Sequence, residues 1–317
     1  MLKVGLAGIG GISNKHIEAW NEFEETELVA ICDNRPECAN VCPGVRFYQD
    51  YNEMLEKEEL DIVDICVPTF LHREFSIKAL DRGIHVICEK PLALKADDVT
   101  AMYAAAKRNN VKFMSTQPLH FMPGYEYLKN AIDTQKYGRL ISGTMLRLSA
   151  KPASSGNWMA NEKLSGLVAY DMHIHDLDFL VYALGKPTEA TGRRSRLPEQ
   201  DVFHATYVFG DVFVHCEGSW YAARFPWTQE YRFQFEKAVV TGSQGWVTVY
   251  TDTGKVISSK KELCNTDEVI ELTDDDGYHG ELRYFCDCVY YGRPVEKVTE
   301  EEIHTVIETL NTVAPLD

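Results

Sequence analysis

Short apolar runs alternate with amphipathic stretches over the first 118 residues of the chain. The runs are rich in Val, Ile and Leu, and they lie at residues 2–9, 27–32, 62–67, 85–88 and 111–115. Such short, continuous apolar segments are typical of strands that are buried on both faces of a parallel sheet. Helical spacing separates them, as in residues 97–109, and the alternation predicts a doubly wound parallel sheet.

The pattern changes after residue 118. Longer segments rich in aromatic and β-branched residues follow at residues 140–149, 203–209, 212–220, 231–235 and 246–250. Glycine turns separate these segments, which predicts a large, mostly antiparallel open sheet. Helices are expected at residues 125–134, 166–184, 278–291 and 300–313. A chain of 317 residues is too long for one ordinary core, so we expect an α/β domain at residues 1–118 and an α+β domain at residues 119–317.

A glycine-rich turn follows the first apolar run. Its sequence is Gly8-Ile9-Gly10-Gly11-Ile12-Ser13, and Asp33 ends the second run. Glycines allow a tight turn and close approach of the backbone to a pyrophosphate, while the start of a helix offers amides and a positive dipole. Ser13 stands where a third glycine is usual, so the motif is imperfect, and a chance glycine-rich turn is the alternative. The order strand, turn, helix, strand and acid favours a dinucleotide site.

The segment Asp33-Asn34-Arg35 is expected on the ribose side of that site. Asp33 favours NAD, because a carboxylate accepts the ribose hydroxyls and repels a 2′-phosphate. Arg35 could offset that charge and permit NADP. NAD is therefore the expected cofactor, with NADP as the alternative.

Three further segments fall at the carboxyl ends of predicted strands, where doubly wound sheets bind their ligands. They are Pro68-Thr69, Glu89-Lys90-Pro91 and Gln117-Pro118. A lysine at a strand end can simply be solvated. A partly desolvated ammonium beside a cofactor can instead donate a proton or a hydrogen bond to a substrate oxygen. Pro91 fixes the backbone after Lys90, with a cis bond as one possibility.

A second group of polar residues lies in the predicted helix at residues 166–184. Asp171, His175 and Asp178 follow i, i+4, i+7 spacing and would share one stripe. A histidine flanked by carboxylates can act as a general base, and a satisfied structural histidine is the alternative. His173-x-His175 also suggests a metal site. Residues i and i+2 point about 200° apart on a helix, so no metal is expected.

Composition and charge exclude several classes of partner. The formal net charge of −16 argues against nucleic acid and against anionic membranes, because both need clustered Lys and Arg. No apolar run approaches the ~20 residues that span a bilayer, and the first residues enter a predicted strand at once. The nine cysteines include no C-x-x-C pair, which favours buried, reduced thiols. We therefore expect a cytoplasmic protein.

These motifs together resemble the Gfo/Idh/MocA family, which is typified by glucose-fructose oxidoreductase and inositol dehydrogenase. The resemblance runs from the N-terminus to about residue 310 of the sequence. It is carried by Gly8–Ile12, Val67–His72, Glu89–Leu92, Phe121–Pro123, Trp158, Leu164–Gly166 and Asp171–Asp178. It implies a Rossmann domain, then a domain that binds substrate and forms dimers or tetramers. It also implies hydride transfer between NAD(P) and a carbon of a sugar or cyclic polyol.

By this resemblance, Lys90 and Asp171 would hold the reacting oxygen and His175 would be the general acid/base. The implied cofactor-binding residues are Gly8, Ile9, Gly10, Gly11, Ile12, Asp33, Asn34, Arg35, Pro68, Thr69, His72, Glu89, Lys90 and Gln117. The implied substrate-binding residues are Lys90, His120, Trp158, Asp171, His173 and His175. His120 and His173 depart from the residues frequent in the family at the expected substrate pocket, which leaves the exact substrate open. Thr69 replaces a frequent Asn in the cofactor loop.

Two other functions fit the same motifs. A glycosidase that oxidises its substrate transiently with bound NAD would carry a similar set of residues. A non-catalytic sensor on the same fold would not need Lys90, Asp171 and His175, so their presence favours an enzyme.

Overall fold

The computed structural model describes residues 1–152, 158–197, 199–260 and 266–316. Its contacts divide the chain into two compact units. The first unit consists of residues 1–117 and 278–307, and the second of residues 118–277 and 308–317. Residues 278–307, which the sequence-based division assigned to the second domain, thus return to the first unit. The return is a tertiary contact, because α8 (Tyr278–Tyr290) packs against α1 (Ser13–Glu22).

The first unit is built on a six-stranded parallel sheet in the order β3-β2-β1-β4-β5-β6, which confirms the predicted fold class. The strands are β1 (Leu2–Ala7), β2 (Thr26–Cys32), β3 (Arg46–Tyr48), β4 (Ile62–Ile65), β5 (His85–Cys88) and β6 (Phe113–Ser115). This order places the switch point between β1 and β4, where such sheets bind dinucleotides. Val4, Leu6 and Val63 are fully buried, as the continuous apolar runs predicted.

Helices cover this sheet and end where the sequence supplies a stop. They are α1, α2 (Tyr51–Lys57), α3 (His72–Leu80), α4 (Ala96–Asn109), α8 and the start of α9 (Glu300–Val313). Asp50 caps α2 by accepting a hydrogen bond from the Glu53 amide. Asn110, in the left-handed conformation, ends α4.

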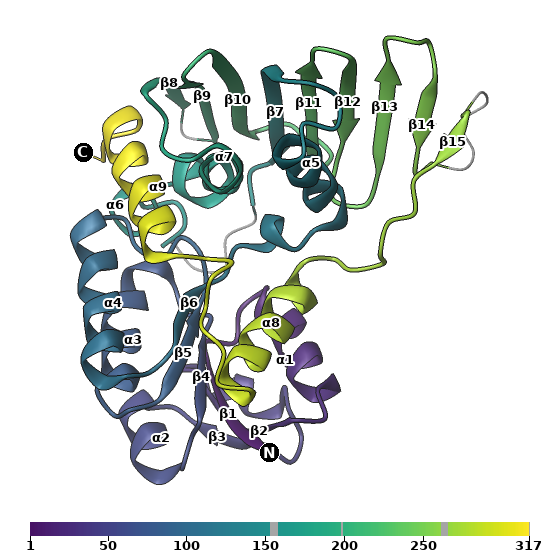
Figure 1. Cartoon of the computed structure of the whole chain (residues 1–317). Coiled ribbons are helices and arrows are strands. Elements are labelled where there is room, and N and C mark those ends of the chain that lie inside the picture. Colours follow the sequence, from purple (N-terminus) through teal and green to yellow (C-terminus); the bar gives the residue numbers. More distant parts are fainter. Residues whose placement is uncertain (153–157, 198, 261–265, 317) are drawn as a thin grey trace. The chain divides into compact units, whose positions relative to one another are not determined.

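The second unit is built on a nine-stranded sheet in the order β15-β14-β13-β12-β11-β7-β10-β9-β8 (Figure 1). The strands are β7 (Leu140–Ala150), β8 (Glu189–Leu197), β9 (Gln200–Phe209), β10 (Val212–Tyr221), β11 (Thr228–Phe235), β12 (Ala238–Gly242), β13 (Val247–Thr251), β14 (Val256–Ser258) and β15 (Glu268–Val269). β10 pairs with β7 in parallel, and so does β14 with β15. The other pairs are antiparallel. The expected mostly antiparallel open sheet is therefore confirmed.

Helices α5 (Pro123–Asp133) and α7 (Ile174–Leu184) lie on one face of this sheet, as Figure 1 shows. Burial alternates residue by residue along β11, with one set of side chains packed and the other exposed. The other face of the sheet carries large exposed side chains, including Phe213 next to the buried Val214. Period-two burial of this kind is what a sheet covered on one face requires.

The predicted helix at residues 166–184 is interrupted. The structure has a short α6 (Glu162–Ser165), then a π-helical turn at Ala169–His173, and then α7. Gly166 and Leu167 both have positive φ, at 71° and 56°, so the helix cannot run through them. A Cβ on Gly166 would lie 2.4 Å from the ring of Tyr170, which explains the glycine. The strand β8 was missed, because its charged residues hide the alternation of an edge strand.

The eight cysteines within the described residues are free and buried, as expected, and Cys264 lies outside those residues. Over the parts of the chain that the structure describes, every helix is too short or too polar to cross a bilayer.

Candidate functional site

The glycine-rich turn has the shape that a pyrophosphate needs. Gly8 has φ of 96°, and a Cβ there would lie 2.5 Å from the Val67 amide nitrogen. By contrast, no described atom lies within 4 Å of a Cβ built on Gly10 or Gly11, so the backbone is open there. None of the described side chains caps the N-terminus of α1, and its first turn holds no acid. The positive end of the α1 dipole therefore meets no acidic side chain in its first turn, and it lies behind an open glycine backbone. This arrangement suits a dinucleotide phosphate.

Asp33 closes the turn from the end of β2. Its Oδ2 accepts a hydrogen bond of 2.8 Å from the Ile9 amide, so the acid and the glycine turn are joined directly. Arg35 donates from Nε to Oδ1 and from Nη2 to Oδ2, both at 2.9 Å. Burial alone would raise the pKa of Asp33, but the hydrogen bonds from Arg35 and Ile9 hold it below its usual value. The carboxylate is charged and preset where a ribose would lie.

The Lys90 turn is fixed through its backbone. The Lys90 amide lies 3.0 Å from Glu89 Oε2 and 3.0 Å from Thr116 Oγ1, and the Lys90–Pro91 bond is cis. Glu89 itself is buried, and its amide donates to the Ile65 carbonyl at 2.9 Å. The ends of β4, β5 and β6 thus hold the residue that carries the candidate ammonium.

The other predicted residues at these strand ends are mostly buried. Thr69 is 6% exposed, and His72 and Gln117 are each 1% exposed. The two ring nitrogens of His72 each lie 2.9 Å from a carbonyl oxygen, those of Pro91 and Val67. His72 therefore ties the Pro68-Thr69 loop to the Lys90 turn, and its contacts are those of a structural residue.

A buried polar network beneath these strand ends was not predicted. His16 on α1 lies between Asp64 on β4 and Glu89, with contacts of 2.8 and 3.1 Å. Trp20 Nε1 donates to Asp64 at 2.6 Å, and Glu281 Oε2 accepts from the Gln117 amide at 2.6 Å. One weak signal existed, since His16 and Trp20 are four residues apart on a helix facing a buried sheet. Glu281 had none, because it is 164 residues from Gln117.

The side chains of these acids and of His16 lie as close together as the ligands of a metal ion. Within the described residues, two such groups exist, His16–Asp64–Cys66 and His16–Glu89–Glu281. The contacts of His16 with both carboxylates have hydrogen-bond lengths, and each ring nitrogen already faces one oxygen. The geometry is that of a hydrogen-bonded network.

In the second unit, the π-helical turn carries Asp171 and leads into α7, which carries His175. The Asp171 amide donates to the Leu167 carbonyl at 2.8 Å, and the Val168 amide donates to Asp201 at 3.0 Å. Asp171 is partly exposed, whereas His175 is 8% exposed. Because Asp171 lies in a π turn, its side chain and that of His175 do not share one stripe as they would on a regular α-helix. Such turns are frequent at functional sites because they reposition one side chain within a helix.

Two other predicted residues, His120 and His173, are buried inside the second unit. His120 is fully buried, with Nε2 2.8 Å from Asp178 Oδ2, and its ring stacks on Tyr182 at 3.9 Å. His173 is fully buried as well, and its Nε2 lies 2.6 Å from the Tyr207 hydroxyl. Burial lowers the pKa of His173 to about 3, so its ring is neutral. These contacts hold both rings within the second unit, and their part in substrate binding stays a prediction.

Asp176, one residue after His175, forms a buried ion pair that the sequence did not reveal. Its Oδ1 accepts 2.7 and 3.2 Å hydrogen bonds from Arg147 on β7, and both side chains are at most 3% exposed. Burial raises the pKa of Asp176, and the charge of Arg147 opposes that shift. The pair fixes α7, and with it His175, to the sheet.

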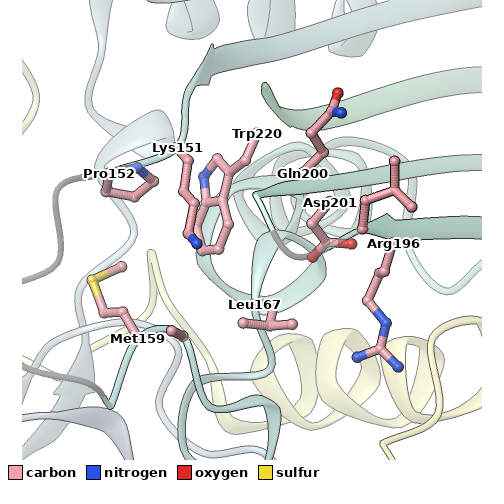
Figure 2. A pocket seen from close by; sticks show the side chains of 10 residues that line it. Lys151, Pro152, Met159, Leu167, Arg196, Gln200, Asp201 and Trp220 are labelled. Carbon is pink, nitrogen blue, oxygen red and sulfur yellow. The ribbon is translucent and has the colours of Figure 1, made fainter. Parts of the chain in front are cut away.

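A cavity of about 280 Å³ lies in the second unit, near the start of the π turn. In Figure 2, Lys151, Pro152 and Met159 lie on one side of the view, and Gln200, Asp201 and Arg196 lie on the other. Trp220 and Leu167 complete an apolar wall. Leu167 lines this cavity, and its carbonyl accepts a hydrogen bond from the Asp171 amide. The cavity therefore adjoins the turn that carries Asp171. Trp158, another predicted residue, is partly exposed and precedes Met159.

Comparison with known proteins identifies the chain. Residues 2–117 match the oxidoreductase family with the NAD-binding Rossmann fold, and residues 125–248 match the GFO/IDH/MocA C-terminal domain. The chain belongs to the Gfo/Idh/MocA oxidoreductase family. The suspected resemblance is thereby confirmed, as is the NAD-binding class of the first unit.

Individual relatives differ in what their names say they act on. D-Apiose dehydrogenase from Paraburkholderia graminis is 32% identical over 201 residues, which cover 62% of this chain and 53% of that protein. A 2,7-anhydro-N-acetylneuraminate hydratase from Mediterraneibacter gnavus is 27% identical, over 78% of this chain and 67% of that protein. The structure of a levoglucosan dehydrogenase with NADH and levoglucosan has a TM-score of 0.83 at 18% identity, and covers 99% of this chain and 97% of that one. The chain spans about half the length of the apiose dehydrogenase that it matches.

The predicted site residues fall into two groups. The cofactor-binding set and Lys90 belong to the first unit, and Asp171 and His175 belong to the second. Within the first unit, the structure brings the glycine turn, Asp33 and Arg35 together, and separately joins Glu89, Lys90 and Thr116.

Proposed function

We propose that this protein is an NAD(P)-dependent dehydrogenase that acts on a CH–OH group of a sugar or cyclic polyol. The observation that carries the proposal is the direct link between Asp33 and the glycine turn, in an open turn with an uncapped helix behind it. Family membership supports the same activity. When bound, the nicotinamide accepts or supplies a hydride.

The roles of the chain's own residues follow from their chemistry. Lys90 would donate a hydrogen bond to the reacting oxygen, because its ammonium carries three donors and its backbone is fixed by Glu89 and Thr116. His175 would take the hydroxyl proton as the alcohol is oxidised, and return it in the reverse direction. Asp171 would accept a hydrogen bond from the substrate. These roles rest on the resemblance and on the placement of each residue within its own unit.

The cavity beside the π turn would hold part of the substrate away from the reacting carbon. Its wall of Trp220, Leu167 and Met159 offers apolar surface to a sugar ring, and Gln200 and Asp201 offer polar atoms to hydroxyls. Lys151 and Arg196 both pair with carboxylates nearby, those of Glu199 and Glu162. The wall therefore suits a neutral sugar or polyol.

The test is a substrate panel followed by absorbance of reduced nicotinamide. Purified protein with NAD+ or NADP+ should oxidise at least one member of a panel of aldoses, anhydrosugars and inositols. Lys90→Met and His175→Asn should each lower kcat by about 100-fold or more while NAD+ still binds. The absence of turnover across the panel, in protein shown to bind NAD+, would reject the dehydrogenase.

The alternative is redox-neutral chemistry, which the hydratase relative favours. In that case NAD+ would be needed but would show no net reduction, while an anhydro bond or glycosidic bond is opened. Sugar analysis of the same reactions, with nicotinamide absorbance recorded in parallel, separates the two. A non-catalytic sensor would bind cofactor and sugar without product of either kind.

We also infer that copies of this chain associate through the exposed face of the nine-stranded sheet. That face carries Phe213 on β10 and Tyr250 on β13, which are 52% and 49% exposed. Large apolar side chains on one open face are typical of an interface. Light scattering should give a dimer or tetramer, and Phe213→Glu should shift it toward monomer. The cysteines among the described residues are free and buried, which suits the expected cytoplasmic setting.

A further inference from the structure

His16 links the helix behind the glycine turn to the strand end that carries Lys90. The side chain is fully buried on α1, with Nδ1 2.8 Å from Asp64 Oδ2 and Nε2 3.1 Å from Glu89 Oε1. Carboxylate oxygens accept hydrogen bonds and do not donate them, so both ring nitrogens must carry protons. His16 is therefore an imidazolium that bridges two carboxylates.

Glu89 contacts both His16 and the backbone of Lys90. One oxygen of Glu89 faces His16 and the other lies 3.0 Å from the Lys90 amide. The carboxylate is 6% exposed, and the charges of His16 and Lys90 outweigh burial and lower its pKa. A charged carboxylate held at both oxygens fixes the plane of the turn more firmly than a single hydrogen bond would.

The other end of the link is the cofactor turn. His16 lies in the first turn of α1, and Ser13, at the start of that helix, donates from Oγ to the Gly10 carbonyl at 2.8 Å. A helix turn is stiff, so a displacement of the Gly8–Ser13 backbone carries His16 with it. His16 then acts on Glu89 and on the Lys90 backbone.

We propose that His16 is a positioning residue that couples dinucleotide binding at the Gly8–Ser13 turn to the placement of Lys90, through Glu89. The inference rests on the proposed function for the importance of Lys90, but the coupling itself needs no turnover. It explains why a charged network is buried here, where apolar packing would cost less.

The charged and titratable groups around His16 favour the bridging imidazolium. Burial lowers the pKa of His16, and the facing Asp64 and Cys66 raise it well above its ordinary value. Trp20 Nε1 also donates to Asp64. Burial and the nearby Glu89 raise the pKa of Glu281 well above its usual range. Its Oε2 accepts a hydrogen bond from the Gln117 amide.

The experiment measures the reactivity of Lys90 with and without ADP-ribose. ADP-ribose lacks the nicotinamide, so it occupies the glycine turn and the ribose side without covering the place where a hydride is transferred. The rate at which an amine-reactive reagent labels Lys90, read by peptide mass spectrometry, should change by at least about 5-fold on saturation with ADP-ribose. In His16→Gln, saturated to the same degree, the rate should not change.

Two further variants keep the test decisive. Glu89→Gln preserves the shape of the side chain but cannot accept hydrogen bonds at both of its terminal atoms, so it should also lose the coupling, even where His16→Gln is poorly folded. His85→Gln is the matched control, because His85 lies at the opposite end of β5 and contacts the Lys112 amide. It should keep the full response to ADP-ribose.

Turnover supplies a second readout once a substrate is known. His16→Gln should lower kcat by about 10-fold or more while the Kd for NAD+ changes by less than about 3-fold. Retained coupling in folded His16→Gln, or none in the wild type at full occupancy, would overturn the proposal. A failed substrate panel with intact coupling would instead reject only the proposed function.

Discussion

Arg35 holds the Asp33 carboxylate through two hydrogen bonds of 2.9 Å, one to each oxygen. The guanidinium also donates to the Ile9 carbonyl at 2.5 Å, so it lies along the glycine turn. A bidentate arginine on the ribose acid offsets the charge that would repel a 2′-phosphate. The relationship makes cofactor preference depend on both residues.

Arg35→Ala should therefore move the preference toward NAD. Loss of a charge-assisted contact of about 1.5–3 kcal/mol should weaken the binding of NADP+ by about 10-fold or more, while the affinity for NAD+ stays nearly unchanged. Asp33→Asn should act in the opposite direction, weakening NAD+ and improving NADP+. Fluorescence titrations of both cofactors check this, and an unchanged NAD+/NADP+ ratio in both variants would contradict it.

Gly8 and Gly10 should respond differently to the same substitution. Gly8→Ala places a methyl group 2.5 Å from backbone at a φ of 96°, so we expect a loss of stability of about 2 kcal/mol or more. Gly10→Ala meets no described atom within 4 Å, so its melting temperature should stay close to wild type. Its methyl group would instead enter the pyrophosphate space and weaken NAD+ binding. Thermal melts and NAD+ titrations distinguish the two.

His173 should contribute to loss of stability in acid. Its folded pKa of about 3 lies below the value of about 6.5 for an unfolded histidine. Between these values the unfolded chain binds the extra proton, so the free energy of unfolding falls as pH decreases, by about 1.4 kcal/mol per pH unit. His173→Gln cannot take that proton and should show a shallower pH dependence. Urea denaturation at pH 7, 6 and 5 measures it.

The exposed His215→Gln provides the comparison for that series, because His215 lies on the other face of the sheet. It should leave the slope unchanged. Identical slopes for wild type and His173→Gln would show that the neutral buried ring is not a source of the acid sensitivity.

The Arg147–Asp176 pair should be costly to break from one side. Arg147→Met leaves a buried carboxylate without its partner and should cost about 3–5 kcal/mol in unfolding free energy. The double variant Arg147→Met with Asp176→Leu should recover part of that loss. Lys255→Gln, which removes the exposed Lys255–Glu268 pair, should cost less than about 1 kcal/mol. Chemical denaturation checks all three, and equal costs would contradict the burial argument.

The sequence alone determined the elements and motifs whose signals are local. Apolar runs of β1, β4 and β5, the glycine turn with Asp33, and the Lys90 turn all lie within a few residues of their own signals. The alternation of strands and helices predicted a doubly wound parallel sheet, because parallel neighbours need a crossover helix between them. The order of the strands came only from the structure. The family resemblance was readable because its motifs are also local.

Tertiary structure alone decided which polar groups were partners. Nothing local says that α8 returns to the first unit, that Glu281 meets Gln117 or that Arg147 meets Asp176. The sequence shows only that a polar residue can form hydrogen bonds. Whether its partner is a substrate or a distant side chain depends on where the fold buries it. The sequence did not reveal that the rings of His120 and His173 lie beside Asp178 and Tyr207, because those partners are distant along the chain.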